Sequence, residues 1–76
     1  MGLRMMREAA GLSQQELCRA IGSRTVSRVW AWEAWDQVPR PATARDPRIM
    51  SLATARLVAD ALDMTLDDFW RGLSGV

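Results

Sequence analysis

Two arginines and two hydroxyl residues lie close together in the chain and have side chains suited to binding nucleic acid. They are Arg24, Thr25, Ser27 and Arg28. A guanidinium forms paired hydrogen bonds with a phosphate or with the edge of a guanine, and a hydroxyl bonds to a phosphate or a base. The same residues would also suit the capped start of a helix with solvated charges around it. We expect all four to contact DNA.

The sequence holds no residue set for catalysis. It has no histidine and a single cysteine, Cys18, which excludes a zinc site, a Cys–His catalytic pair and an internal disulfide. Three aspartates, Asp63, Asp67 and Asp68, suggest a metal site at first sight, but stabilisation of helix ends explains them better. We therefore expect no enzyme activity, cofactor, metal or small-molecule ligand.

The charged residues are unevenly distributed along the chain. All ten basic residues are arginine, and the formal net charge is +1. Residues 1–48 contain eight arginines and five acidic residues, a net charge of +3, whereas residues 49–76 contain two arginines and four acidic residues, a net charge of −2. Arginine suits phosphate and guanine better than lysine, although a GC-rich genome would produce the same bias. The first part is therefore expected to face phosphate.

Length and composition favour a single cytoplasmic domain over residues 1–76. No uncharged run approaches the ~20 apolar residues that a membrane span needs. The N-terminus runs straight into a polar helical pattern, with no secretory signal. A lone cysteine then indicates a reduced, cytoplasmic protein without membrane contact.

The elements that position the candidate cluster follow from periodicity and capping signals. A first helix is predicted over residues 3–10, with Leu3, Met6 and Ala10 on its inward face, and ends at Gly11. A Ser-x-x-Glu capping box, Ser13 with Glu16, starts a second helix, which Gly22 ends. This order of elements, a short helix, a glycine, a capped helix and a glycine turn, is typical of a helix-turn-helix unit. In such a unit a small residue, here Cys18, allows the second and third helices to cross closely.

A third helix is predicted within residues 25–35, with Val29 and Trp32 facing inward. Three prolines then indicate a loop over residues 36–50. Ser51 is expected to cap a fourth helix and Thr65 a fifth. Their predicted inward residues are Leu52, Ala55, Val58, Ala59 and Leu62 on the fourth helix, and Leu66, Phe69, Trp70 and Leu73 on the fifth.

Three segments in this order resemble one known family. LRMMREAAGLSQQELCRAIG resembles the opening of the Cro and phage-repressor type of helix-turn-helix protein, the XRE family. Trp32-Glu33 matches the end of that family's third helix, and SLATARLVADALDMTLDDFW is similar to its closing helices. The resemblance implies a compact, all-α, five-helix domain like that of lambda repressor, whose third helix reads the major groove of double-stranded DNA.

Two departures from the family pattern affect the third helix. Glu33 lies eleven residues after Gly22, one more than the family has. If the extra residue lies in the turn, Thr25 is the N-cap and Val29 the buried anchor. If it lies later, Arg28 takes the buried position, which is costly for a charge, so we prefer the first register. Trp35 replaces the family's glycine, and the helix is therefore expected to continue by a turn.

Six further residues are candidate DNA contacts: Gln14, Gln15, Trp30, Arg40, Arg45 and Arg48. By the resemblance, the first glutamine touches phosphate, and polar surface is the alternative for both. The tryptophan would form part of the core rim, contact a thymine methyl group or face a partner. The three loop arginines would either grip the DNA backbone or remain solvated in a mobile loop.

We expect a sequence-specific transcriptional regulator, a phage or mobile-element repressor that binds its operator as a homodimer. Trp70, Leu73 and Val76 are the expected dimer surface, because they are apolar at helical spacing in the acidic part of the chain. The alternative is a protein-interaction module, antitoxin-like or host-factor-binding, that uses exposed tryptophans. Four tryptophans in 76 residues favour that alternative, and the arginine cluster disfavours it.

Overall fold

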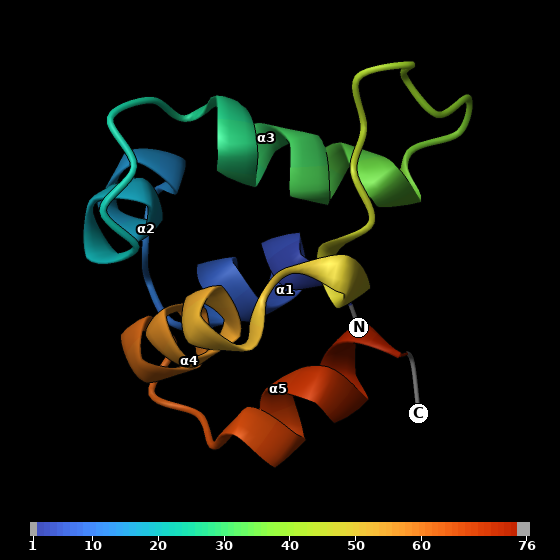
Figure 1. Cartoon of the computed structure of the whole chain (residues 1–76). Helices are drawn as coiled ribbons and strands as arrows, with labels where there is room; N and C mark the ends of the chain where they lie inside the picture. The colour runs from blue at the N-terminus through green and yellow to red at the C-terminus, as the bar shows by residue number, and fades with distance from the viewer. Residues whose placement is uncertain (1, 75–76) are drawn as a thin grey trace.

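Five short α-helices and two 3₁₀ turns make up the regular structure of residues 2–74, the part of the chain that this computed structural model describes (Figure 1). In chain order they are α1 (Leu3–Ala9), α2 (Gln14–Ala20), α3 (Ser27–Glu33), η1 (Ala34–Asp36), η2 (Pro47–Ile49), α4 (Leu52–Ala61) and α5 (Leu66–Leu73). No strand occurs in this range, and none of its helices is long and apolar enough to cross a membrane. The expected all-α, five-helix fold is confirmed.

Side-chain caps start three of the helices where the sequence predicts them. At α2, the Ser13 hydroxyl accepts the Glu16 amide at 3.1 Å, and the Glu16 carboxylate accepts the Ser13 amide at 2.9 Å. The hydrogen bond from the Ser13 backbone also holds the pKa of the Glu16 carboxyl below its usual value. Ser51 and Thr65 cap α4 and α5, each accepting a backbone amide three residues ahead. These local bonds fix where the helices begin.

The core lies between all five helices and holds the inward residues of each. Val29, on α3, is completely buried, and Trp32 is 5% exposed. Figure 1 shows α3 at the top of the molecule, α1 in the middle, and α4 and α5 at the bottom. The buried cluster comprises Leu3, Met6, Leu17, Cys18, Ile21, Val29, Trp32, Ala55, Val58, Ala59, Leu62 and Phe69. One face of α3 is thus held in the core and the other remains outside.

The turn between Gly22 and α3 leaves Val29, not Arg28, in the buried position, as the preferred register predicts. This turn is held by the Ser23 amide, which donates to the Cys18 carbonyl at 2.9 Å, and by the Ser23 hydroxyl, which donates to the Thr25 carbonyl at 3.0 Å. Gly22 supplies the positive φ of 76° that the turn needs. The prediction of Thr25 as N-cap is wrong, however. The cap is Val26, without a side-chain bond, because the Ser23 bonds extend the turn past Thr25.

Two smaller predictions about core faces are also wrong. Leu52 was expected to face inward but is 62% exposed. It is the first residue of α4, and the helix becomes buried only from Ala55 onward. Ala10 is an exposed C-cap rather than part of the inward face of α1, because that helix ends at Ala9. After Glu33, η1 continues the third helix through Asp36, so the expected extra turn is present.

Cys18→Leu is expected to lower the free energy of unfolding by about 1–3 kcal/mol, because a larger side chain overpacks the site. Cys18 is 2% exposed and lies on α2, which packs against both α3 and α4. Thermal denaturation of the variant measures this cost. An unchanged melting temperature would show that the helices leave room at this position.

Candidate nucleic-acid interface

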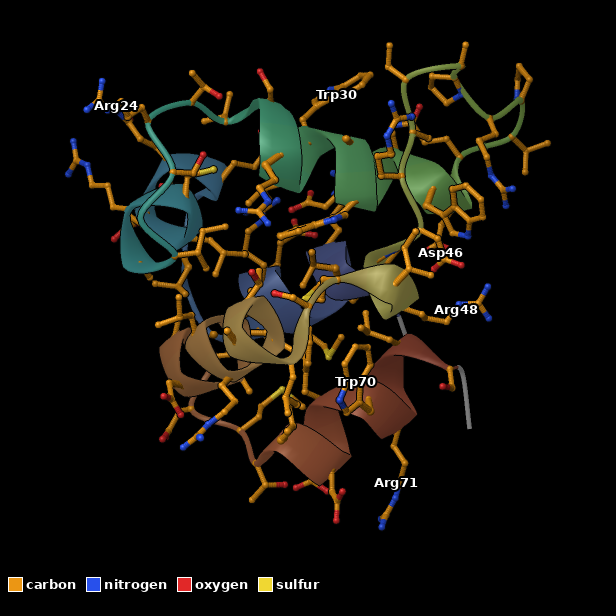
Figure 2. The ribbon with its side chains drawn as sticks, in the orientation of Figure 1. Arg24, Trp30, Asp46, Arg48, Trp70 and Arg71 are labelled. Atoms are coloured by element: carbon orange, nitrogen blue, oxygen red, sulfur yellow. The ribbon has the colours of Figure 1, made fainter. Side chains whose placement is uncertain are left out.

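The outer face of α3 combines polar residues at its start with exposed apolar side chains. Arg24, Thr25 and Ser27 are exposed around the turn and the first residue of the helix. Val26 and Trp30, one helical turn apart, are 42% and 41% exposed. Figure 2 shows Trp30 projecting from α3 at the edge of the molecule, with Arg24 near the start of the helix. Val26 and Trp30 are therefore the large apolar side chains that this face exposes to solvent.

The loop after η1 returns alongside α3 and forms the second side of an open groove. The Arg45 amide donates to the Ala31 carbonyl at 2.9 Å, and Ala44 beside it is 6% exposed. We call this hollow the α3–loop groove, and its lining residues are Ser23, Thr25, Val26, Ser27, Arg28, Trp30, Ala31, Thr43 and Arg45. The lining contains two arginines and no acidic residue, so the groove attracts anionic partners.

Two of the three loop arginines bind residues close to them in the chain. Arg40 stacks over the Trp35 ring, 3.6 Å from its centroid, and donates to the Trp35 carbonyl at 2.7 Å. Arg48 pairs with Asp46 at 2.8 Å, and this hydrogen-bonded pair holds the pKa of the Asp46 carboxyl below its usual value. In Figure 2, Arg48 lies well away from Trp30 and Arg24. Only Arg45 joins the groove beside α3.

Arg28 leans from α3 toward α4 rather than outward along the helix. Its guanidinium donates to the Thr54 hydroxyl at 3.4 Å and lies over the Trp32 ring, 5.3 Å from the centroid. The residue is nevertheless exposed and lines the α3–loop groove. Its charge thus lies at the rim of the groove, and Trp30 and Val26 occupy the middle of the outer face.

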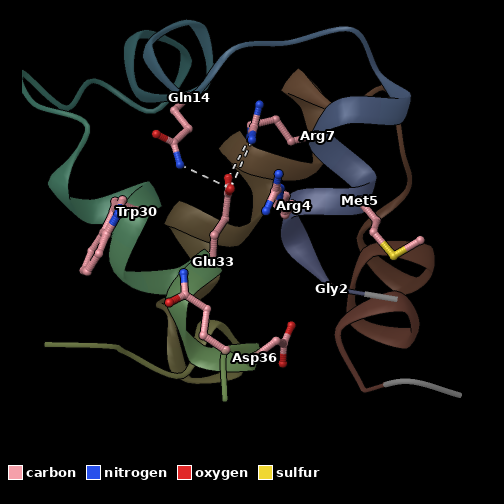
Figure 3. Close-up of a pocket in the computed structure, with 9 residues that line it drawn as sticks. Gly2, Arg4, Met5, Arg7, Gln14, Trp30, Glu33 and Asp36 are labelled. Atoms are coloured by element: carbon pink, nitrogen blue, oxygen red, sulfur yellow. Dashed lines mark hydrogen bonds and ion pairs between the residues drawn. The ribbon is translucent and has the colours of Figure 1, made fainter. Parts of the chain in front are cut away.

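A buried ion pair, which the sequence reasoning missed, joins α1 to the end of α3. Arg7 donates to both oxygens of Glu33, with Nε–Oε2 at 2.7 Å and Nη2–Oε1 at 3.1 Å, and its Nη1 donates to the Leu12 carbonyl at 2.8 Å (Figure 3). The Arg7 side chain is 11% exposed and that of Glu33 only 4%. Bonding to Glu33 raises the pKa of Arg7 above its usual value. The pair fixes the end of α3 against α1.

The same carboxylate orients one of the two candidate glutamines. The Gln14 amide donates to Glu33 at 3.3 Å, as Figure 3 shows, so this first residue of α2 is tied to α3. Gln15 is exposed. Both glutamines thus lie at the start of α2, but only Gln14 has its side chain positioned by the buried pair.

The candidate dimer residues are only partly available at the surface. Trp70 and Leu73 are half-buried and pack against the core cluster. The Trp70 ring also contacts Phe69, with centroids 5.7 Å apart. Val76 lies outside the described residues. Part of the apolar area on α5 is therefore already used within the monomer.

Chemically, this face offers hydrogen-bond donors and apolar surface to a binding partner. No group of three or more histidine, cysteine, aspartate or glutamate residues suited to a metal occurs between residues 2 and 74. The α3 face offers guanidinium and hydroxyl donors around an apolar centre. No protein-family model matches the chain, and no curated protein or solved structure shows significant similarity to it. What this protein does must therefore be inferred from the geometry of α2, α3 and the loop.

Proposed function

We propose that this protein is a sequence-specific, double-stranded-DNA-binding transcriptional regulator of the Cro and phage-repressor kind, which acts in the cytoplasm and inserts α3 into the major groove. One observation carries the proposal. α3 has a buried face anchored by Val29 and Trp32, and an outer face with Arg24, Thr25 and Ser27 at its start. The only acidic residue of α3, Glu33, is neutralised in the buried pair. Such a helix presents donors and no repulsive charge to DNA.

Dimer formation is part of the proposal. Two recognition helices bind successive major-groove faces when they lie ~34 Å apart. The described residues have extents of 31 × 30 × 23 Å, so two adjacent copies would give a spacing of this order. A two-fold dimer would then match a partly palindromic operator. We keep Trp70 and Leu73 as the proposed surface, since each retains some exposed apolar area.

The dependence of duplex binding on salt concentration tests the proposal. Because each neutralised phosphate releases counterions, the logarithm of the association constant should fall linearly with the logarithm of salt concentration. Arg24→Ala should weaken binding and reduce the magnitude of that slope by about one. Fluorescence anisotropy with a pool of random-sequence duplexes, and then with the sites that the protein selects from the pool, measures both quantities.

Arg71→Ala serves as the matched control for Arg24→Ala. Both arginines are exposed, and Figure 2 shows Arg71 on α5, at the opposite end of the molecule. This variant should keep the wild-type slope. Absence of duplex binding even at low salt, or an equal change of slope in both variants, would overturn the proposal.

A protein-interaction module, antitoxin-like or host-factor-binding, is the second candidate function. The exposure of Val26 and Trp30 favours it, because apolar and aromatic side chains on one face are typical of protein interfaces. The arginine rim of the groove argues for DNA instead. A folded protein that binds no duplex at low salt would move the interpretation to this second candidate.

A further inference from the structure

We infer that the outer face of α3 recognises the methyl groups of thymine, so that the preferred site carries thymine where Trp30 and Val26 meet the major groove. This inference rests on the proposed DNA binding and specifies its base preference. The two side chains are one helical turn apart and are both about two-fifths exposed, at 41% and 42%. They line the α3–loop groove together, on the face that does not pack into the core.

The chemistry of the base edges decides what such a face can read. The thymine 5-methyl group is the apolar feature of the major groove, whereas the other features are hydrogen-bond donors and acceptors. A tryptophan ring and valine methyls cannot pair with those donors and acceptors along their carbon surface. They gain free energy by covering a methyl group and removing it from water. Thymine is therefore the base that matches the middle of this face.

The surroundings of the apolar pair favour DNA over a protein partner. Arg28 and Arg45 line the same groove, and no acidic side chain does. Arg24 is exposed just before the helix. A duplex offers an apolar methyl group between two phosphate strands, which complements an apolar centre flanked by cations. A protein partner would need a protruding apolar side chain surrounded by acidic residues. The experiment below distinguishes such a partner from DNA.

Two hollows border Trp30, and the loop forms one wall of the first of them, the α3–loop groove. Arg45 is held beside α3 because its amide donates to the Ala31 carbonyl at 2.9 Å. Trp30 also borders a second hollow, on the side of α1 and α2, so it lies between the two hollows. With two-fifths of its surface exposed there, this side chain is available to a base edge.

Deoxyuridine substitution isolates the methyl group, because deoxyuridine differs from thymidine only in lacking it. The wild-type protein first selects a binding site from random-sequence duplexes. Each thymine of that site is then replaced singly, and affinities are measured by anisotropy. At one or two adjacent positions the wild-type affinity should fall about threefold to fourfold, the effect expected for one methyl group. Trp30→Ala should bind the thymine site more weakly and show no further loss with deoxyuridine.

Two controls separate this inference from a general loss of binding. Leu57→Ala, which truncates a similarly exposed residue of α4 (45%), should retain the wild-type sensitivity to deoxyuridine. Trp30→Ala should keep the wild-type salt slope, since Trp30 contacts no phosphate in this proposal. Circular dichroism and thermal denaturation confirm that both variants fold.

Distinct results overturn the inference and the proposed function. If the protein selects and binds a duplex but no deoxyuridine substitution changes the wild-type affinity, the thymine inference fails and DNA binding stands. A deoxyuridine effect that persists in Trp30→Ala also overturns the inference. If no duplex binds at low salt, the proposed function fails, and the face is then an interface for protein.

Discussion

Arg7→Ala is expected to lower the free energy of unfolding by about 3–5 kcal/mol, because it leaves a buried carboxylate without its cation. The Glu33 side chain is 4% exposed and accepts two hydrogen bonds from Arg7. In the variant, only the amide of Gln14, at 3.3 Å, remains to it among these partners. The Leu12 carbonyl also loses the donor that holds the turn before α2. Urea denaturation followed by circular dichroism measures the loss.

Arg4→Ala is the matched control on the same helix. Arg4 pairs with Glu8 at 3.3 Å, but the two side chains are 68% and 54% exposed. An exposed pair of this spacing contributes about 0.3–0.5 kcal/mol. Equal losses in the two variants would contradict the assignment of Arg7 and Glu33 as a buried structural pair.

The double variant Arg7→Met, Glu33→Leu distinguishes the cost of an unpaired charge from the value of the pair. Apolar residues of similar volume often replace a buried ion pair with little cost. We expect the double variant to recover most of the stability lost in Arg7→Ala. If it instead remains as unstable as Arg7→Ala, the pair contributes stability of its own through its bonds to Leu12 and Gln14.

Phe69→Ala is expected to be the most destabilising truncation on α5, at about 3–5 kcal/mol. Phe69 is completely buried and is among the largest fully buried side chains. A domain of this size has a total stability of about 4–11 kcal/mol, so the variant loses a large fraction of it. We expect a lowered urea midpoint and a substantial unfolded population at 37 °C.

Trp70→Ala tests the proposed dimer surface. It removes the aromatic side chain that follows Phe69 in the chain. Trp70 is half-buried, so its truncation should cost the monomer less than Phe69→Ala. If it lies in a dimer interface, sedimentation equilibrium should show weaker self-association than in the wild type. A stability loss equal to that of Phe69→Ala, with unchanged self-association, would assign Trp70 to the monomer core.

The parts of the fold that the sequence predicted are those determined by neighbouring residues. Ser13 with Glu16, Ser51 and Thr65 each act within one helical turn, so their types and spacing are sufficient to locate helix starts. The burial of Val29 followed from helical periodicity combined with the cost of burying a charged arginine. Five helices, their order and most of their inward faces follow from such local rules.

The parts that the sequence did not predict depend on contacts between distant residues. Arg7 and Glu33 are 26 residues apart, and no spacing rule links them. Arg40 and Arg48 were expected as cations that were either free in the loop or gripping DNA, but Arg40 stacks on Trp35 of η1 and Arg48 pairs with Asp46. Thr25 was predicted as a cap from the preferred register of the family pattern, whereas the Ser23 hydrogen bonds shift the helix start. In each case the tertiary arrangement decides which partner a side chain finds.

The loop is bonded to the third helix and η1 at only a few points, so its sequence can change during evolution without disturbing the core. The loop is held at its start by Arg40 on Trp35 and at its end by the Arg45 amide on Ala31. Other side chains near these two contacts do not pack in the core. Val38, for example, is 96% exposed. Insertions or substitutions there would reshape one wall of the α3–loop groove and leave the packing of α3 intact. Descendants of this chain would thus acquire a differently shaped groove by altering the loop, with little cost to folding.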